Sequence, residues 1–156
     1  MNRVALLMGG NQGDRRALMK QATELIRKRI GSVVAVSADH ETMPWGTFDE
    51  AAPSLFLNRA LLVETDLGAH EVLREALAIE AALGRRRPLN TEHYHSRPMD
   101  IDLIFWNDEV IDTPDLTIPH PRAHLRRFVL EPLADIMPGY PHPLLGKTVK
   151  ELLDEI

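Results

Sequence analysis

The order of strand-like and helix-like segments is the sequence feature that most limits the folds this chain can adopt. Apolar and β-branched residues fill segments 4–8, 32–38, 55–65 and 99–106, which we predict to be strands. Two other segments, 14–30 and 69–83, carry apolar residues at helical spacing, and each is followed by a glycine, Gly31 or Gly84. The order strand–helix–strand–strand–helix–strand predicts an α+β fold of the ferredoxin-like type, an αβα sandwich with a mainly antiparallel sheet.

The rest of the chain continues the same domain. Short strands are expected at 110–111 and 116–118, and helices at 128–136 and 149–156. With 156 residues and no repeat or linker, residues 1–156 are predicted to form one domain. Two loops rich in polar residues and proline, 43–53 and 85–97, interrupt the elements, and loops longer than about ten residues are more often functional than accidental.

Composition excludes several classes of protein. The absence of cysteine excludes a disulfide scaffold, a Cys-ligated zinc site and a thiol nucleophile, and it agrees with a reducing, cytoplasmic compartment. No apolar run approaches the roughly 20 residues that a membrane span requires, so no membrane association is expected. Seven arginines gather between residues 85 and 127, but acids are interspersed and the net charge is −5, so a phosphorylated small molecule is a better partner than nucleic acid. These arginines are Arg85, Arg86, Arg87, Arg97, Arg122, Arg126 and Arg127.

Two aspartates inside an apolar strand give the strongest local signal. Asp100 and Asp102 should share one strand face, roughly 7 Å apart, with Ile101, Leu103 and Phe105 on the other. Two neighbouring carboxylates repel each other unless a cation such as Mg²⁺, bound jointly with substrate phosphates, lies between them. A solvated strand face would explain the same pattern, but the arginine-rich stretch beside it favours a metal with phosphate.

Several single residues are candidates with an equally simple structural explanation. Glu80 interrupts the apolar stripe of its helix. It is either an acid buried near a site or a residue at the edge of the stripe. Phe56 and Asn58 share a strand face, where they could stack on and read a heterocycle or simply belong to the core and its edge. Phe128 could likewise stack on a heterocycle or belong to the core. His120 lies in a rigid Pro-His-Pro turn, where it could donate a hydrogen bond to a phosphate or simply form part of the turn.

Two motifs argue against other functions. His93-Tyr94-His95 lacks the ligand spacing of a zinc site. The glycine-rich run from Gly9 to Gly13 lacks the Gly-Lys-Ser/Thr ending of a Walker A loop, so we predict a tight turn from strand to helix.

Taken together, these segments resemble the 6-hydroxymethyl-7,8-dihydropterin pyrophosphokinases of folate biosynthesis over nearly the whole chain. The most specific part is the Arg-x-x-Asp-x-Asp element followed by the Pro-His turn. The matching segments are Gly9-x-Asn11, Thr42-x-Pro44-x-Gly46, Phe56-Leu57-Asn58, Ile79-Glu80 with Gly84-Arg85, Arg97-x-x-Asp100-Ile101-Asp102, Leu116-Thr117-Ile118-Pro119-His120 and Arg126-x-Phe128.

The resemblance implies a reaction and a set of site residues. The family moves the pyrophosphoryl group of ATP to the pterin hydroxymethyl oxygen and leaves AMP, with two Mg²⁺ ions. By resemblance, the catalytic residues are Arg85, Arg97, Asp100 and Asp102, the last two also holding the metal. ATP would be bound by Glu80, Arg87, Arg97, Leu103, Leu116, Thr117, His120 and Arg126. The pterin would be bound by Thr42, Met43, Trp45, Phe56, Asn58, Asp100 and Phe128.

Three positions depart from the family's usual pattern. His93-Tyr94 stands where Arg-Trp is common, Met43 where proline is common, and Pro121 where tyrosine is common. None is one of the two aspartates, so we expect the activity on ATP and a dihydropterin to be kept. We also expect the enzyme to be a monomer. Two alternatives stay open: another Mg²⁺-dependent phosphotransferase on the same scaffold, and a non-catalytic nucleotide- or pterin-binding module.

Overall fold

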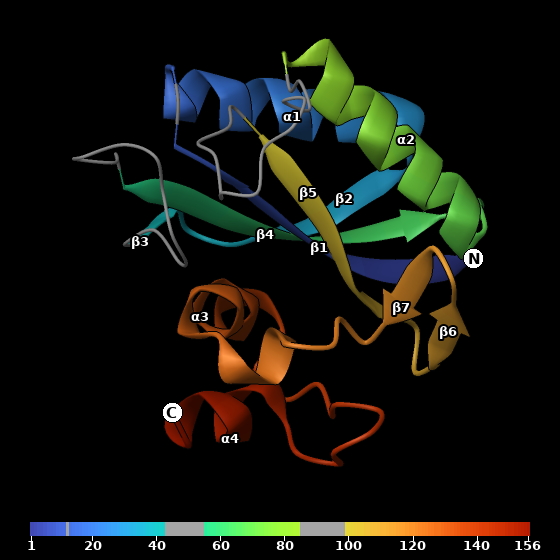
Figure 1. Ribbon diagram of the computed structural model, residues 1–156, viewed down its shortest axis with the longest axis vertical. Coiled ribbons are helices and arrows are strands. Elements are labelled where there is room, and N and C mark those ends of the chain that lie inside the picture. Colours follow the sequence, from blue (N-terminus) through green and yellow to red (C-terminus); the bar gives the residue numbers. More distant parts are fainter. Residues whose placement is uncertain (12, 43–54, 85–98) are drawn as a thin grey trace.

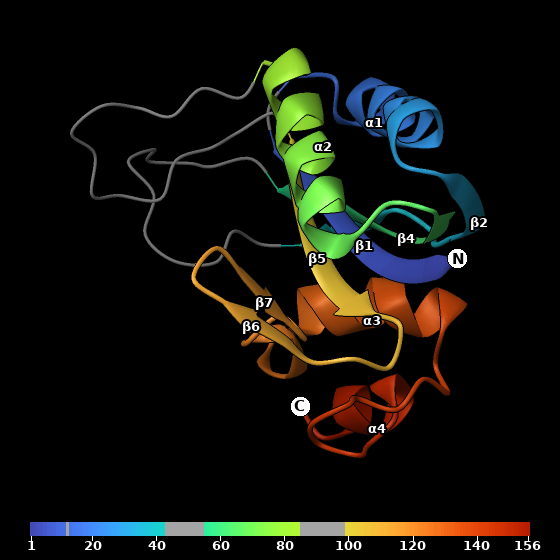
Figure 2. The same cartoon turned by 90° about the vertical axis from the view of Figure 1, so that its right-hand side faces the viewer.

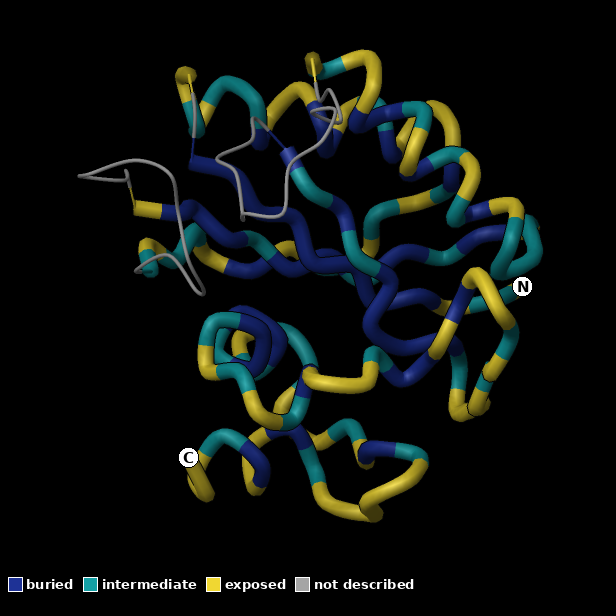
Figure 3. The backbone as a smooth tube through the Cα atoms, viewed as in Figure 1, coloured by how far each residue is buried: buried dark blue, intermediate teal, exposed yellow. Residues whose placement is uncertain are grey.

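A five-stranded antiparallel sheet forms the centre of the computed structural model, which describes residues 1–11, 13–42, 55–84 and 99–156. Four strands run in the order β2-β4-β1-β5, and β3 pairs with β4 beyond the end of β2 (Figure 1). The strands are β1 (Asn2–Gly10), β2 (Ser32–Val36), β3 (His40–Thr42), β4 (Phe56–Thr65) and β5 (Asp100–Trp106). The central pair, β1 and β4, supplies most of the buried sheet (Figure 3).

Two helices, α1 (Arg15–Arg29) and α2 (Ala69–Ala82), cover one face of the sheet. The side chain of Asp14 caps α1 by accepting the Ala17 N–H at 3.1 Å, which satisfies one of the open donors of the first turn. Their apolar stripes pack on alternate residues of the strands. This core includes Leu6, Met8, Ile26, Leu57, Leu61, Ile79, Ile101 and Leu103.

The opposite face is covered by α3 (Arg127–Ile136), with α4 (Val149–Asp154) packed beneath it (Figure 1). A short 3₁₀ turn, η1 (Ala123–Leu125), leads into α3. Thr148 and Glu151 form a capping box at the start of α4, and this makes a six-residue helix possible. The second core contains Leu7, Ala60, Ile104, Phe105, Leu130 and Leu133.

A small hairpin lies beside β5. It consists of β6 (Ile111–Thr113) and β7 (Leu116–Ile118), which pair antiparallel, and Figure 2 shows it standing out from the edge of the main sheet. The chain then passes through the cis Ile118–Pro119 bond and returns along β5, where the His120 N–H donates to the Ile104 carbonyl at 3.1 Å. This bond brings His120 onto the sheet.

The predicted α+β sandwich is confirmed, with three local differences. Strand β3 was missed because His40, Glu41 and Thr42 carry no apolar signal. Strand β1 extends through Gly9 and Gly10, which we had placed in a turn. Phe105 lies in the α3 core rather than beside Ile101, because a shift in the β1–β5 register rotates the strand between them.

No helix in the part of the chain that the structure describes has the length and apolar character to cross a bilayer.

Candidate active site

Three residues form a row across the sheet at the end where β1 finishes. Gly9 on β1 pairs with Asn58 on β4 to one side and with Asp100 on β5 to the other. A Cβ added to Gly9 would lie 2.7 Å from Asn58 Oδ1, closer than real Cβ contacts allow. The glycine therefore makes room for the buried amide of Asn58 to lie against β1. The sequence predicted a turn at Gly9 and a family-like Gly9-x-Asn11 segment. The contact of Gly9 with Asn58 depends on strand register, which the sequence alone did not give.

The two aspartates of β5 point to the α3 side of the sheet. Ile101 and Leu103 belong to the α1–α2 core, whereas Ile104 belongs to the α3 core, so Asp100 and Asp102 alternate onto the α3 side. Both are partly buried. The predicted common face of the two carboxylates therefore agrees with the observed packing.

Glu80 secures the peptide between these aspartates. It lies on α2 and is only 3% exposed, and its Oε2 accepts the Ile101 N–H at 2.7 Å. This hydrogen bond joins α2 to the start of β5. Glu80 thus supports the strand that carries the two carboxylates, which agrees with the reading of a buried acid near a site.

The donor set fits Mg²⁺ that is shared with a substrate. Within the described residues, no group of three or more His, Cys, Asp or Glu side chains is arranged to hold a metal ion. Asp100 and Asp102 would thus supply two carboxylates and leave most coordination positions to other oxygens. Mg²⁺ is commonly held by one or two carboxylates plus substrate phosphates and water, so the residues present fit it.

A cavity of about 220 Å³ opens beside Asp102. It brings together four residues predicted to bind ATP, which come from β5, from the β6–β7 hairpin and from the turn after it. These are Leu103, Leu116, Thr117 and His120, and Leu73, Ile101, Asp115 and Pro121 complete the wall. Its wall combines apolar side chains with polar and charged groups, which suits a heterocycle that carries a charged group.

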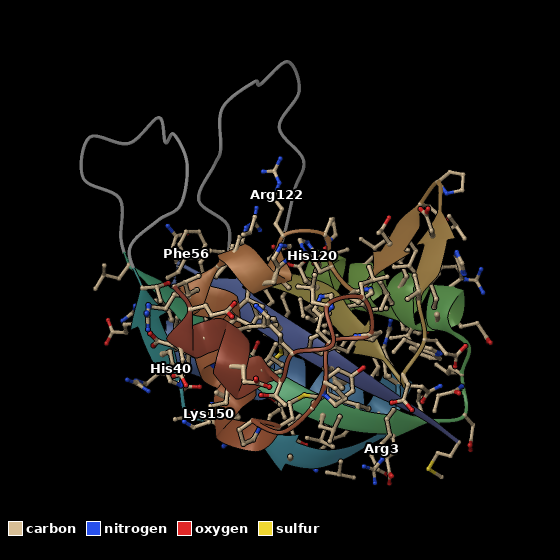
Figure 4. All side chains as sticks on the ribbon, turned by 90° about the horizontal axis from the view of Figure 1, so that it is seen from below. Arg3, His40, Phe56, His120, Arg122 and Lys150 are labelled. Carbon is tan, nitrogen blue, oxygen red and sulfur yellow. The ribbon has the colours of Figure 1, made fainter. Side chains whose placement is uncertain are left out.

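His120 presents a hydrogen-bond donor at this cavity. Its Nδ1 accepts the Arg122 N–H at 3.4 Å, so a neutral ring carries its proton on Nε2. Burial lowers the pKa of His120 and the charge of Arg126 lowers it further, whereas Asp100 acts in the opposite direction. His120 and Phe56 lie toward the same end of the molecule, and Arg3 lies at the other end (Figure 4).

The residues predicted to bind a pterin lie on the other side of Gly9. Phe56 and Asn58 are both buried on β4, and Asn58 Nδ2 donates to Thr42 Oγ1 at 2.7 Å. Phe128 lies on α3 and packs against the core beneath the sheet, and the guanidinium of Arg126 lies 5.6 Å from the centre of its ring. The sheet thus supplies one aromatic ring and an anchored amide, and α3 supplies a second aromatic ring.

Five predicted site residues lie outside the described residues. They are Met43, Trp45, Arg85, Arg87 and Arg97. His93 and Tyr94, which depart from the family's usual pattern, also lie outside the described residues.

The sequence matches a known family over residues 5–138, the 7,8-dihydro-6-hydroxymethylpterin-pyrophosphokinases (HPPK). This chain belongs to the HPPK family. It is therefore an ATP-dependent diphosphotransferase of folate biosynthesis, as its resemblance implied.

Three curated HPPK relatives are 38–39% identical to this chain over the residues that align. The 2-amino-4-hydroxy-6-hydroxymethyldihydropteridine pyrophosphokinase of Porphyromonas gingivalis is 38% identical over 141 residues, which cover 90% of this chain and 93% of that protein. The enzyme of the same name from Methylorubrum extorquens is 38% identical, covering 100% and 94%. That from Bacillus subtilis is 39% identical, covering 87% and 79%.

Solved structures share the HPPK fold at lower identity. A crystal structure of wild-type Plasmodium falciparum HPPK-DHPS superimposes with a TM-score of 0.77 at 17% identity, covering 99% of this chain and 44% of that one. A structure described as HPPK-DHPS in complex with substrates gives a TM-score of 0.76 at 15% identity and covers 99% and 43%. The likeness concerns the fold, and this chain spans less than half the length of those chains.

Proposed function

We propose that the α3 side of the sheet, from Phe56 to Asp102, carries out the HPPK reaction. The hydroxymethyl oxygen of 6-hydroxymethyl-7,8-dihydropterin attacks the β-phosphorus of ATP. The bond between the β-phosphorus and the oxygen bridging it to the α-phosphorus breaks, and AMP leaves with that oxygen. The row of Asn58, Gly9 and Asp100 carries this proposal, because it sets an amide and a carboxylate on either side of a residue that has no side chain to separate them.

The dihydropterin lies between Phe56 and Phe128 in this proposal. Flat rings stack favourably on a heterocycle, and burial of Asn58 makes its hydrogen bonds selective. The bond from Asn58 to Thr42 fixes the amide orientation before the substrate arrives. Met43 and Trp45 complete the pterin site in this proposal.

ATP occupies the cavity beside Asp102, with its base against Leu103, Leu116 and Thr117. His120 donates from Nε2 to a phosphate oxygen, and Arg126 adds positive charge. Arg85, Arg87 and Arg97 neutralise further phosphate charge, and Glu80 supports the site through β5. Phosphoryl-type transfer asks a protein mainly for positioning and charge stabilisation, and this set of residues supplies both.

Asp100 and Asp102 hold two Mg²⁺ ions in this proposal. When bound, Mg²⁺ neutralises triphosphate charge and makes the attacking hydroxyl more acidic. Asp100 pairs with Gly9 in the β1–β5 register, which supports a role for it in accepting the hydroxyl proton. We further propose a monomer of one domain, residues 1–156, that acts in the cytoplasm without nucleic acid.

The nucleotide product tests the reaction directly. The protein is mixed with MgATP and the dihydropterin, and we expect AMP only when both substrates are present. Asp100→Ala and Asp102→Ala should each lower kcat by at least about 100-fold while the protein stays folded, since they remove charge stabilisation at the reacting group. Asp66→Ala, an exposed aspartate in the turn before α2, is the matched control.

Other products would contradict the proposal in distinguishable ways. ADP would indicate a different phosphotransferase. Binding of both ligands without turnover would indicate a binding module. Full activity of Asp100→Ala would show that the metal and proton roles lie elsewhere.

A further inference from the structure

His40 connects the two layers that flank the proposed dihydropterin site. It lies on β3, and its Nε2 is 2.7 Å from Asp135 Oδ2 on α3. Its Nδ1 lies 3.7 Å from Glu131 Oε2 on the same helix. One imidazole thus joins two carboxylates one turn apart, and its side chain is only 23% exposed.

The helix residues that contact His40 share a face with Phe128. Residues 128, 131 and 135 are separated by three and four positions, so they follow one another along a single side of α3. The face of α3 that carries Phe128 therefore also holds the contacts to β3, one and two turns further along. Any rotation or displacement of α3 relative to β3 would move that ring.

The strand side of the contact leads equally directly to the site. His40 is paired with Asn58 across β3 and β4, and Thr42 follows two positions later on the same strand face. Thr42 Oγ1 accepts from Asn58 Nδ2, and Phe56 is the β4 partner of Thr42. His40 is thus the first residue of a short strand whose last residue orients the amide.

Further bonds hold the two carboxylates toward β3. Asp135 Oδ2 also accepts the Ala38 N–H at 3.2 Å, just before β3 begins. Glu131 is paired with Arg127 at 3.2 Å, so its charge is shared between a guanidinium and the imidazole. Figure 4 shows His40 on the same flank of the molecule as Phe56.

We infer that His40 is a positioning residue for the dihydropterin: by joining β3 to α3 it sets the spacing between the ring of Phe128 and the wall formed by Phe56 and Asn58. This inference rests on the proposed placement of the pterin between those rings. His40 does not touch the reacting atoms in this arrangement. Its effect is on the geometry of a stacked pocket, in which a shift of about 1 Å is costly.

The test separates the two substrates. With His40→Ala, we expect the Kd of 6-hydroxymethyl-7,8-dihydropterin, measured by calorimetry with a non-hydrolysable ATP analogue and Mg²⁺, to rise about tenfold. The Kd of the ATP analogue alone should change less than threefold, because its cavity lies beyond β5. His40→Gln, which keeps a donor for Asp135, should recover most of the affinity.

Two controls assign each outcome. His70→Ala removes a histidine that also bonds a carboxylate, Asp115 at 3.1 Å, but braces the β6–β7 hairpin, and it should leave the dihydropterin Kd unchanged. Phe128→Ala should weaken dihydropterin binding by more than His40→Ala does. If Phe128→Ala has no effect, the placement of the pterin is wrong and this inference falls with it.

Two results would overturn the inference while leaving the placement intact. One is a dihydropterin Kd unchanged by His40→Ala although Phe128→Ala raises it. The other is an equal loss of affinity for both substrates without recovery in His40→Gln, which would make His40 a general structural contact.

Discussion

Replacing Gly9 with alanine tests the geometry of the site most directly. The added Cβ would lie 2.7 Å from Asn58 Oδ1, and contacts become ordinary only from 3.4 Å, so one of the two groups must move by about 0.7 Å. The backbone of Gly9 does not have a positive φ, so a steric conflict is the whole perturbation. The nearest atom is an amide oxygen whose own nitrogen is held at 2.7 Å from Thr42 Oγ1.

A displacement of this size weakens the amide's hydrogen bonds. The Asn58–Thr42 bond would lengthen past the usual range, at a cost of about 1 kcal/mol. Overpacking of a filled site typically costs about 1–3 kcal/mol of stability. If the pterin loses a comparable part of its contact with the misplaced amide, its Kd rises about ten- to a hundredfold, which corresponds to about 1.4–2.7 kcal/mol.

Calorimetry and steady-state kinetics measure this effect. We expect a raised dihydropterin Kd and KM, a smaller change for ATP, and a lower Tm. Gly139→Ala is the matched control, because a Cβ there would meet no atom within 4 Å and its φ is not positive. Alanine is otherwise preferred to glycine in a strand, so wild-type affinity together with an unchanged or raised Tm in Gly9→Ala would refute the reasoning.

Three further predictions concern stability. Glu80→Ala should lower the free energy of unfolding by about 1–3 kcal/mol in urea titrations, because it removes the acceptor of the Ile101 N–H, and Glu80→Gln should keep most of that stability. Thr148→Ala should cost about 1 kcal/mol by removing the cap of α4, a fall in Tm of about 2–4 °C in calorimetry. Burial lowers the pKa of His142 below its ordinary 6.5, so its neutral form contributes fully to stability above pH 6.5 and this contribution falls as the pH drops below 6.5. His142→Asn keeps an acceptor for the Leu144 and Leu145 N–H groups. This variant should flatten the dependence of Tm on pH between about 7 and 5.5.

Hydrophobic periodicity was sufficient to predict the elements that have one solvent-exposed side and one buried side. The helices α1 and α2 and the long strands match the predicted segments within a few residues. Strand β3 could not be found in this way, because its side chains are polar and its position is set by pairing with β4. The facing of Phe105 was also mispredicted, since a register shift in an edge pair leaves no trace in the order of apolar residues.

The same distinction holds for the candidate site, where local patterns were predictable from the sequence and long-range contacts were not. The common face of Asp100 and Asp102 follows from the alternation of a strand, and the sequence was enough to indicate it. The contact between Gly9 and Asn58 joins residues 49 positions apart through the register of β1 and β4, so it requires the three-dimensional structure. The link from His40 to Asp135 spans 95 positions and joins two layers, which no local pattern encodes.

These long-range contacts divide the site into two halves. The carboxylates are held by β5 and Glu80 from one side, whereas the pterin-facing amide is held by Thr42 and by the space at Gly9 from the other. Among the described strands, β1 lies between the two halves. Substitutions on β3 or α3 should therefore alter dihydropterin affinity first, and substitutions on α2 or β5 should alter nucleotide and metal use first. A variant of His40 that changed nucleotide binding alone would contradict this division.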